Sequence, residues 1–64
     1  MNIQATLNSV EAAKFLSLSR QTLANWRHSG KGPDYIRLGR AIRYRNSDLN
    51  EFIEKNRVRV EIKQ

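Results

Sequence analysis

The chain has 64 residues, of which 39% are hydrophobic, and carries a formal net charge of +6. This length accommodates one small domain, and the absence of cysteine excludes disulfide bridges and thiolate zinc sites. The sequence has neither an apolar run of membrane-spanning length, about 20 residues, nor the pattern of a signal peptide. We therefore expect a protein of the reducing cytoplasm.

The positive charge is confined to one segment. Between Arg20 and Arg45 there are seven basic residues and one acid, Asp34, whereas the basic and acidic residues elsewhere cancel. A charge excess limited to one segment indicates a polyanionic partner better than the same charge spread evenly.

A first helix is predicted over about residues 10–17, after a lead-in of seven residues with little pattern. Asn8 or Ser9 can cap it, and Asn8 with Glu11 has the spacing of a capping box. Its buried face combines Val10, Ala12, Ala13 and Leu16.

A second helix is predicted over residues 20–29, because Ser19 is a good N-cap and Gly30 suits the left-handed conformation that often ends a helix. Its buried stripe is formed by Leu23 and Trp26, together with Leu18 from the preceding turn. Two short helices joined by about three residues predict a helix-turn-helix.

A β-hairpin is predicted for the alternating stretch "YIRLGRAIRYR". If its apolar residues all face inward, Leu38 opposes Ile42 and Ile36 opposes Tyr44. This register leaves residues 39–41 as a three-residue loop, because a two-residue turn would mix the apolar and charged faces.

The arginines of this hairpin are then expected on its outer face. Arg37, Arg43 and Arg45 point outward, Arg37 faces Arg43 across the strands, and Arg40 lies at the tip. Like charges directly opposite each other are destabilising. The arrangement is interpreted either as a solvated strand face, where water screens the charges, or as one that holds an anion, and the polar side of the second helix favours the anion.

A third helix is predicted after Ser47, which would cap it, with Asp48 and Glu51 near its positive end. Its apolar face consists of Leu49, Phe52 and Ile53. The tail, residues 57–64, alternates apolar and charged side chains. It is interpreted either as an unstructured basic end or as a short strand that pairs with the hairpin edge or with a neighbouring protomer.

The side of the second helix opposite its buried stripe is polar and has little acidity. It comprises Gln21, Ala24, Asn25 and His28, flanked by Arg20 and Arg27. Gln and Asn can pair with adenine, and Arg can pair with guanine or grip phosphate, so this side suits the major groove of DNA. An arginine-rich hairpin can then reach the neighbouring minor groove or its phosphates.

Residues 7–56 contain, in this order and spacing, the motifs "EAAKFL", "LSRQTL..W", "GKGP", "IRLGRAIRY" and "SDL..FI". With these motifs the chain resembles the excisionase-like and AlpA-type regulators of the MerR-like winged helix-turn-helix superfamily. The resemblance implies a mostly α fold with a small β-hairpin, in the order α-turn-α-β-β-α. We expect one winged helix-turn-helix domain over residues 1–56, followed by the tail.

The resemblance also implies a DNA-binding protein of a phage, plasmid or integrated element, working in the bacterial cytosol at the nucleoid. It would act as an excisionase, as an AlpA-type transcription regulator, or as both. Its partners would be double-stranded DNA, a site-specific recombinase (integrase) and further copies of the chain bound cooperatively.

These patterns together predict a set of DNA contacts. On the recognition helix they are Ser19, Arg20, Gln21, Thr22, Ala24, Asn25, Arg27 and His28. On the hairpin, or wing, they are Arg37, Arg40, Arg43 and Arg45. Backbone contacts are expected from Ser9 and Lys31, since helix N-termini and cations attract phosphate.

Other functions stay open from the sequence. A protein-interaction module or small inhibitor would explain the small size and the tail, and it would bind an acidic protein. RNA binding is less favoured, because paired exposed aromatics and a Gly-rich clamp are absent from the sequence. We expect neither an enzyme nor a cofactor or metal, since no nucleophile–base set, phosphate loop or metal-ligand cluster is found.

Overall fold

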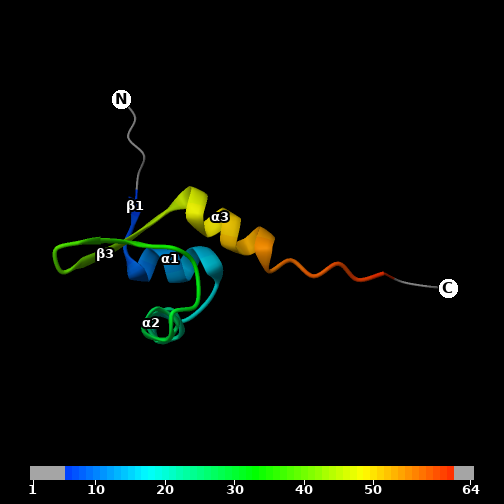
Figure 1. Cartoon of the computed structure of the whole chain (residues 1–64), viewed down its shortest axis with the longest axis horizontal. Helices are drawn as coiled ribbons and strands as arrows, with labels where there is room; N and C mark the ends of the chain where they lie inside the picture. The colour runs from blue at the N-terminus through cyan, green and yellow to red at the C-terminus, as the bar shows by residue number, and fades with distance from the viewer. Residues whose placement is uncertain (1–5, 62–64) are drawn as a thin grey trace, which may run out of the picture.

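Three helices and a small three-stranded antiparallel sheet form the domain in this computed structural model, which describes residues 6–61 (Figure 1). In chain order the elements are β1 (Thr6–Leu7), α1 (Ser9–Leu16), α2 (Arg20–Ser29), β2 (Ile36–Leu38), β3 (Ala41–Arg45) and α3 (Asn46–Lys55). The predicted order α-turn-α-β-β-α is confirmed. The parts of the predicted lead-in before residue 6 and of the predicted tail after residue 61 lie outside the described residues.

α1 begins at the capping box that the sequence predicts. The Oδ1 atom of Asn8 accepts a hydrogen bond from the backbone N–H of Glu11, and the Asn8 N–H donates to Oε1 of Glu11, both over 2.9 Å. These bonds satisfy backbone donors that a first helical turn leaves free. α1 buries Ala12 and Ala13, whereas Val10, which was expected on the same buried face, is exposed.

The turn from α1 to α2 depends on a left-handed residue and a second cap. Ser17 ends α1 with φ 57°, and the hydroxyl of Ser19 accepts a hydrogen bond from the N–H of Thr22 over 3.1 Å. α2 ends at Gly30, with φ 74°. The predicted helix-turn-helix and both predicted caps of α2 are therefore confirmed, but Leu18 is exposed rather than turned inward.

α3 begins earlier than predicted and without the expected cap. Its N-cap residue is Arg45, whose side chain makes no capping hydrogen bond, and Ser47 lies inside the first turn. β3 runs directly into α3 with no intervening loop. The cap prediction fails because the end of the strand, not the nearest hydroxyl, determines where the helix starts.

The sheet has the order β1-β3-β2, with β3 in the middle. Thr6 pairs with Arg45 and Leu7 pairs with Tyr44, so the prediction of a lead-in without structure is wrong for these two residues. A strand this short shows no alternation in the sequence. It forms because β3 offers an open edge beside the start of α1.

The hairpin register differs from the prediction by one residue. Leu38 pairs with Ala41, so Gly39 and Arg40 alone form the turn. Gly39 has φ 65° at the first central position, which is the place of glycine in a type II′ turn, one of the two favoured two-residue hairpin turns. The expected three-residue loop is wrong because the turn chemistry of Gly39 sets the register.

A shift of one residue moves side chains to the opposite face of a sheet. Arg37 pairs with Ile42 and therefore shares the face that carries the buried Tyr44. Arg43 lies on the opposite face with Leu38, whose side chain is 60% exposed. The predicted facing pair of Arg37 and Arg43 and the predicted inward position of Leu38 are both wrong.

The core centres on Tyr44. The large side chains buried with it are Leu23 of α2 and Leu49 of α3, and α1 adds two alanines. Trp26 packs against this cluster, with its ring centroid 5.5 Å from that of Phe52 on α3. Trp26 is thus the core residue that the spacing predicts. The core holds one end of the sheet against all three helices.

The hairpin and the tail leave the domain at opposite ends (Figure 1). The hairpin, called the wing from here on (residues 36–45), projects beyond the helices, and residues 57–61 extend away from the end of α3. No strand is present in residues 57–61, so a strand in this part of the tail, paired with the chain's own wing, is wrong. Pairing with a neighbouring protomer stays a prediction.

Candidate nucleic-acid interface

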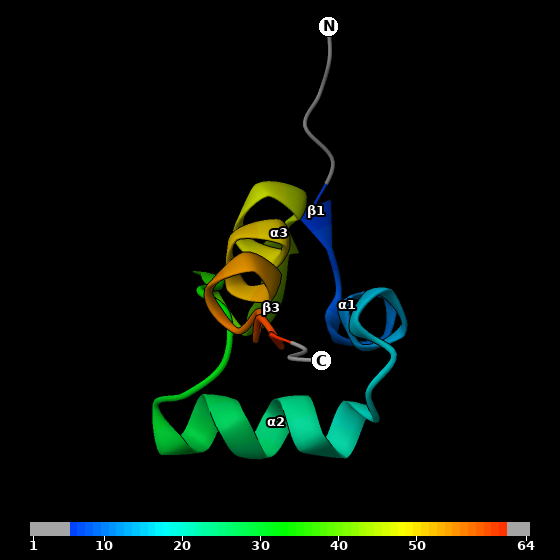
Figure 2. The same ribbon diagram turned by 90° about the vertical axis from the view of Figure 1, so that its right-hand side faces the viewer.

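α2 lies on the outside of the domain, along one side of α1 and α3 (Figure 2). It is held there by Leu23, which is 1% exposed, and by the half-buried Trp26, so its other side faces solvent. We call this other side the polar face, and it consists of the exposed Arg20, Gln21, Asn25 and His28 with the half-buried Ala24. All five were predicted DNA contacts.

Two amide side chains of the polar face are hydrogen-bonded to each other. Gln21 Nε2 donates to Asn25 Oδ1 over 3.1 Å, which is a bond between neighbours one helical turn apart. The bond turns the nitrogen of Gln21 toward Asn25 and leaves Gln21 Oε1 and Asn25 Nδ2 available. An acceptor and a donor together complement the major-groove edge of adenine.

The hydroxyl groups predicted as DNA contacts are part of the helix starts. Ser19 Oγ lies 2.9 Å from Thr22 Oγ1 and accepts the N–H of Thr22. Ser9 is the first residue of α1, and the N-cap of this helix is Asn8. The two N-termini can therefore offer an anion only those first-turn N–H groups that the caps do not occupy.

Arg27, predicted to flank the DNA-facing side, turns toward the sheet. It is half-buried, and its Nη1 donates a hydrogen bond to the hydroxyl of Tyr44 over 3.1 Å. Its guanidinium also lies over the ring of Tyr35, 5.9 Å from the ring centroid. The rings of Tyr35 and Tyr44 are themselves 6.0 Å apart, so the three side chains form one contact group, called the Arg27 cluster.

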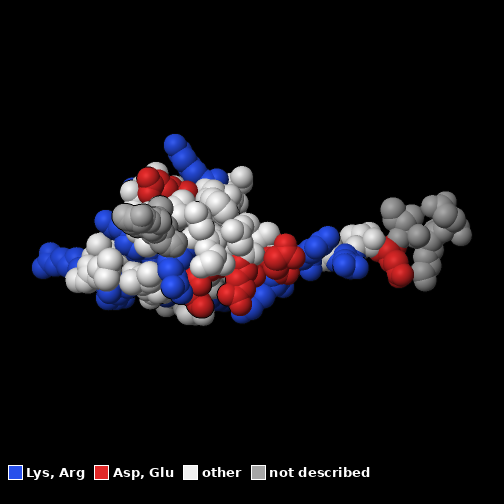
Figure 3. All heavy atoms as spheres, turned by 90° about the horizontal axis from the view of Figure 1, so that it is seen from above, with Lys and Arg blue, Asp and Glu red and all other residues white. Residues whose placement is uncertain are grey.

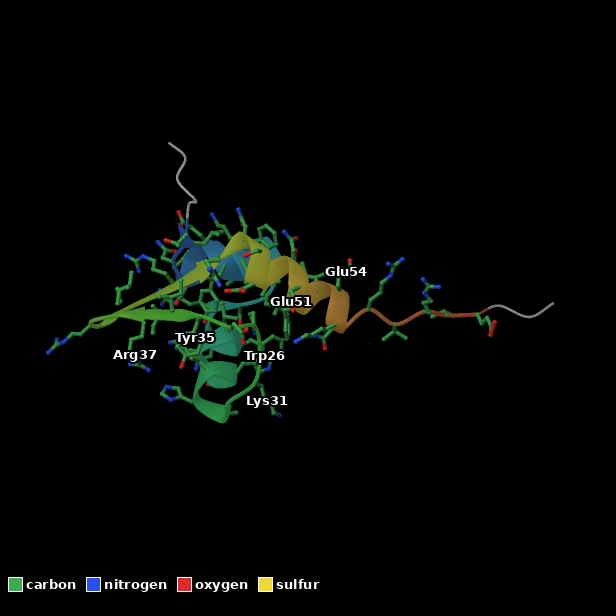
Figure 4. All side chains as sticks on the ribbon, turned by 45° about the horizontal axis from the view of Figure 1, so that its top comes forward. Trp26, Lys31, Tyr35, Arg37, Glu51 and Glu54 are labelled. Carbon is green, nitrogen blue, oxygen red and sulfur yellow. The ribbon has the colours of Figure 1, made fainter. Side chains whose placement is uncertain are left out.

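The arginines of the wing are divided between its two faces. Arg37 is exposed on the face that also carries Tyr44, and in Figure 4 its side chain points to the side of the wing where α2 lies. Arg40 is exposed in the turn at the tip. Arg43 is on the opposite face, where its Nη1 donates to the carbonyl of Ile42 over 2.9 Å.

The two remaining basic residues among the predicted DNA contacts, Arg45 and Lys31, differ in how available they are to a phosphate. Arg45 Nε forms an ion pair with Asp48 Oδ2 over 3.2 Å, although the side chain of Arg45 is still 52% exposed. Lys31 is exposed in the loop after α2. It points away from the body beside the C-terminal end of α2 (Figure 4), where a phosphate contact is sterically open.

Charge is unevenly distributed over the domain (Figure 3). Lysine and arginine crowd the wing end, although one group of acidic residues lies on that half of the body as well. Further acidic residues lie toward the tail, which carries basic residues of its own. Glu51 and Glu54 belong to the acidic residues toward the tail, and Figure 4 shows both on α3, far from Arg37. A polyanion is therefore attracted to the wing end of the domain rather than to α3.

The family model described as "Helix-turn-helix domain" matches residues 6–57, a range that contains all of the helices and strands described above. The chain belongs to the helix-turn-helix domain family. Membership indicates a DNA-binding domain with DNA as its partner, in a family that is typically not enzymatic. No curated protein matches the sequence.

No helix within residues 6–61 is long and apolar enough to span a bilayer. Nor does that part of the chain bring together three side chains of types that could hold a metal ion. An open hollow of about 440 Å³ is bordered by Arg27, Lys31 and Arg45 but also by Asp34 and Asp48, so it does not form a cationic pocket.

Sequence reasoning missed the tyrosines that hold the helix-turn-helix to its wing. Tyr44 was expected only as an inward-facing residue of the hairpin. The missed signal is that Arg27 lies one turn beyond Leu23. A position four residues after a buried leucine faces the same side of a helix, which points Arg27 toward the core and not outward.

Proposed function

We propose that the chain binds double-stranded DNA in a sequence-specific way, with α2 in the major groove and the wing against the adjacent minor groove or its phosphates. The proposal is carried by one observation. Arg37 points to the side of the domain where α2 lies (Figure 4), and the polar face of α2 is open to solvent. A duplex on that side meets both at once.

The dimensions of α2 suit this arrangement. Its ten residues give a length of about 15 Å, and a helix with its side chains is about 10–12 Å across, which fits a major groove about 12 Å wide. Gln21 and Asn25 would read bases, while Arg20 and His28 would reach base edges or phosphates. Arg40, at the tip of the wing, would enter the narrow groove or contact its backbone.

The biological role that we propose is that of an excisionase of a mobile element. Several copies would bind adjacent sites, bend or coat the DNA, and so direct an integrase toward excision in the bacterial cytosol. The support for this role is the resemblance in motifs described above. An AlpA-type transcription regulator would use the same residues, and it is the alternative role.

We place the DNA-binding unit in residues 1–56 and treat residues 57–64 as an accessory tail. The exposed Val58 and Val60 alternate with Arg57 and Arg59. In an array of bound copies this segment would pair with a neighbouring protomer. Amide exchange that stays fast at Val58–Glu61 in both free and DNA-bound protein would contradict the pairing.

A gel retardation assay tests DNA binding, with duplex DNA from the element that encodes the protein and with excess competitor DNA. About six phosphate contacts would give a log–log slope of affinity against salt of roughly −5. Gln21→Ala should change which sequences are preferred, and Arg40→Ala should weaken binding to all of them. Equal affinities of both variants and the wild type for the preferred site would contradict the assigned surface.

The same assay separates the competing roles. A protein-interaction module would bind duplex DNA weakly and an acidic protein tightly. Footprinting at the attachment site of a neighbouring integrase gene would reveal the sequence, number and spacing of the sites. Stimulation of excision in a reaction with that integrase supports an excisionase, whereas a change only in reporter transcription supports the regulator.

A further inference from the structure

We propose that Arg27 is a positioning residue that fixes the angle between α2 and the wing, and not a DNA contact. The inference rests on the proposed function, because the angle matters only when both elements bind one duplex. It replaces the role that the sequence suggests for Arg27. The evidence is the Arg27 cluster, which joins α2 to β3 and to the residue directly before β2, at the base of the wing.

The contacts of Arg27 lead inward. Its Nη1 donates to the hydroxyl of Tyr44 over 3.1 Å, and Tyr44 is 1% exposed, so this end of the guanidinium is bound to a residue that no DNA can touch. The guanidinium face covers Tyr35. A side chain engaged by both its edge and its face has little freedom to reach a phosphate.

The place of the cluster explains why it would control the angle. Arg27 lies in the third turn of α2, Tyr35 directly precedes β2, and Tyr44 is in β3. The wing beyond them carries Arg37 and Arg40 and has no helix packed over its tip (Figure 1). Beside the core packing of Leu23 and Trp26 against the wing, the half-buried Arg27 therefore adds the side-chain hydrogen bond and the ring contact that join α2 to the base of the wing.

A small rotation at this base has a large effect at the tip. From Tyr44 to Arg40 is four residues of strand, about 13 Å, so a rotation of 10° displaces the tip by about 2 Å. A charge-assisted hydrogen bond forms within a few tenths of an ångström of 2.8 Å. A wing that pivots by that amount must be ordered when DNA binds, which lowers the affinity while the phosphate contacts of the bound state stay the same.

Two variants remove the tie and keep the packing. Tyr44→Phe deletes only the hydroxyl that accepts from Arg27. Arg27→Lys keeps the charge but loses the planar guanidinium, which donates a hydrogen bond to Tyr44 and lies over the ring of Tyr35 at the same time. Tyr35→Phe is the matched control, because its hydroxyl takes no part in the three contacts of the cluster. Circular dichroism and thermal unfolding confirm that each variant is folded.

The first measurement uses free protein. Because the sequence has no cysteine, spin labels at Ser29→Cys and Leu38→Cys report the distance between α2 and the wing. We expect one narrow distribution for the wild type and for Tyr35→Phe, and a broadened or shifted one for Tyr44→Phe and Arg27→Lys. Unchanged distributions in both of these variants would overturn the proposal.

The second measurement is DNA affinity as a function of salt, without the labels. Tyr44→Phe should bind about tenfold more weakly, the size of one hydrogen bond to a charged group, with an unchanged salt slope. Arg27→Lys should behave in the same way. The opposite result would show that Arg27 is a DNA contact and that the proposal is wrong. In that case both variants bind like the wild type, and Arg27→Met makes the salt slope less steep by about 0.9, the change expected for one lost phosphate contact.

The two measurements separate this proposal from the proposed function. If wild-type protein binds no duplex DNA, the proposed function fails, while the spin-label distances still decide whether Arg27 sets the angle. If the distances broaden but Tyr44→Phe binds DNA as tightly as the wild type, the angle is irrelevant to recognition and the positioning role is refuted.

Discussion

The free hydrogen-bonding groups of the polar face determine which base it can read. Gln21 Nε2 is directed at Asn25 Oδ1, 3.1 Å away, so the amide of Gln21 has a defined orientation before any DNA is present. With Gln21 Oε1 as acceptor and amide N–H groups as donors, the pair fits adenine and opposes guanine, which presents two acceptors. In the proposed complex the bond would therefore orient Gln21 and Asn25 together for one base pair.

Replacing the amide of Gln21 with a carboxylate should change the base pair that the protein prefers. Gln21→Glu can only accept, and carboxylates accept from N4 of cytosine, so we expect a shift from A·T toward C·G at one position of the site, worth about 1–3 kcal/mol. Selection from randomised duplexes measures it. Asn50→Asp, the same chemical change at an exposed position on α3, is the control, and an identical preference in both variants would refute the assignment.

At the scale of elements, the loop after α2 depends on a glycine pressed against the core. Gly32 has φ +87°, and a Cβ there would lie 3.0 Å from Trp26 Cε3, whereas Gly30, with φ +74°, has open space around it. Both positions strain an L-residue, but only Gly32 adds a clash. This contact holds the loop between α2 and β2 against Trp26, and so helps place the base of the wing.

The two glycines therefore make a matched test. Gly30→Ala should lower the free energy of unfolding by about 1–2 kcal/mol through backbone strain. Gly32→Ala should cost about 1–3 kcal/mol more, the usual cost of overpacking, unless the indole moves. Urea unfolding followed by tryptophan fluorescence measures both. If both variants lost the same free energy of unfolding, the indole of Trp26 would have to move aside without an energetic cost.

The N-termini of α1 and α3 differ in whether a side chain caps them, and two substitutions to alanine can test this difference. Asn8 makes both bonds of its capping box, so Asn8→Ala should destabilise the domain by about 1 kcal/mol. Ser47 lies inside the first turn of α3 and is exposed, so Ser47→Ala should stay within about 0.5 kcal/mol of the wild type. A loss at Ser47 equal to that at Asn8 would restore the cap predicted from the sequence.

At the scale of the whole molecule, the register decides which arginines can face one duplex. Arg37 points to the side of α2, and Arg43 lies on the other face of the same wing. Both are in a domain whose positive end is the wing (Figure 3). All arginines of the wing therefore attract a polyanion electrostatically. Among them, Arg37 and Arg40 are the ones that we expect to reach the phosphates of a duplex lying on the side of α2.

The salt dependence of DNA affinity distinguishes the two faces. Arg37→Ala should reduce the log–log slope by about 0.9, the value for one released phosphate contact, while Arg43→Ala should leave the slope near that of the wild type and weaken binding only slightly. Each variant loses one charge from the same hairpin, so net charge is matched. An equal change of slope in both would show that DNA approaches the wing from its other side.

The sequence by itself determined the parts of this protein that depend on neighbours in the chain. The capping box of Asn8, the cap at Ser19 and the left-handed end at Gly30 are interactions within three or four residues, so both helices of the helix-turn-helix and the turn between them could be predicted. The exposed positions of Gln21 and Asn25 follow from the same helical period. The concentration of charge in one segment is likewise a property of the sequence alone.

Only the tertiary structure decided how these parts face one another. The alternation in the wing favours one register and the turn at Gly39 favours another one residue away, and the two registers place Arg37 on opposite faces relative to Tyr44. The pairing of β1 with β3 and the contacts of Arg27 with Tyr35 and Tyr44 depend on residues far away in the chain. Such contacts form only where packing brings distant side chains together, and no local pattern records which of them will meet.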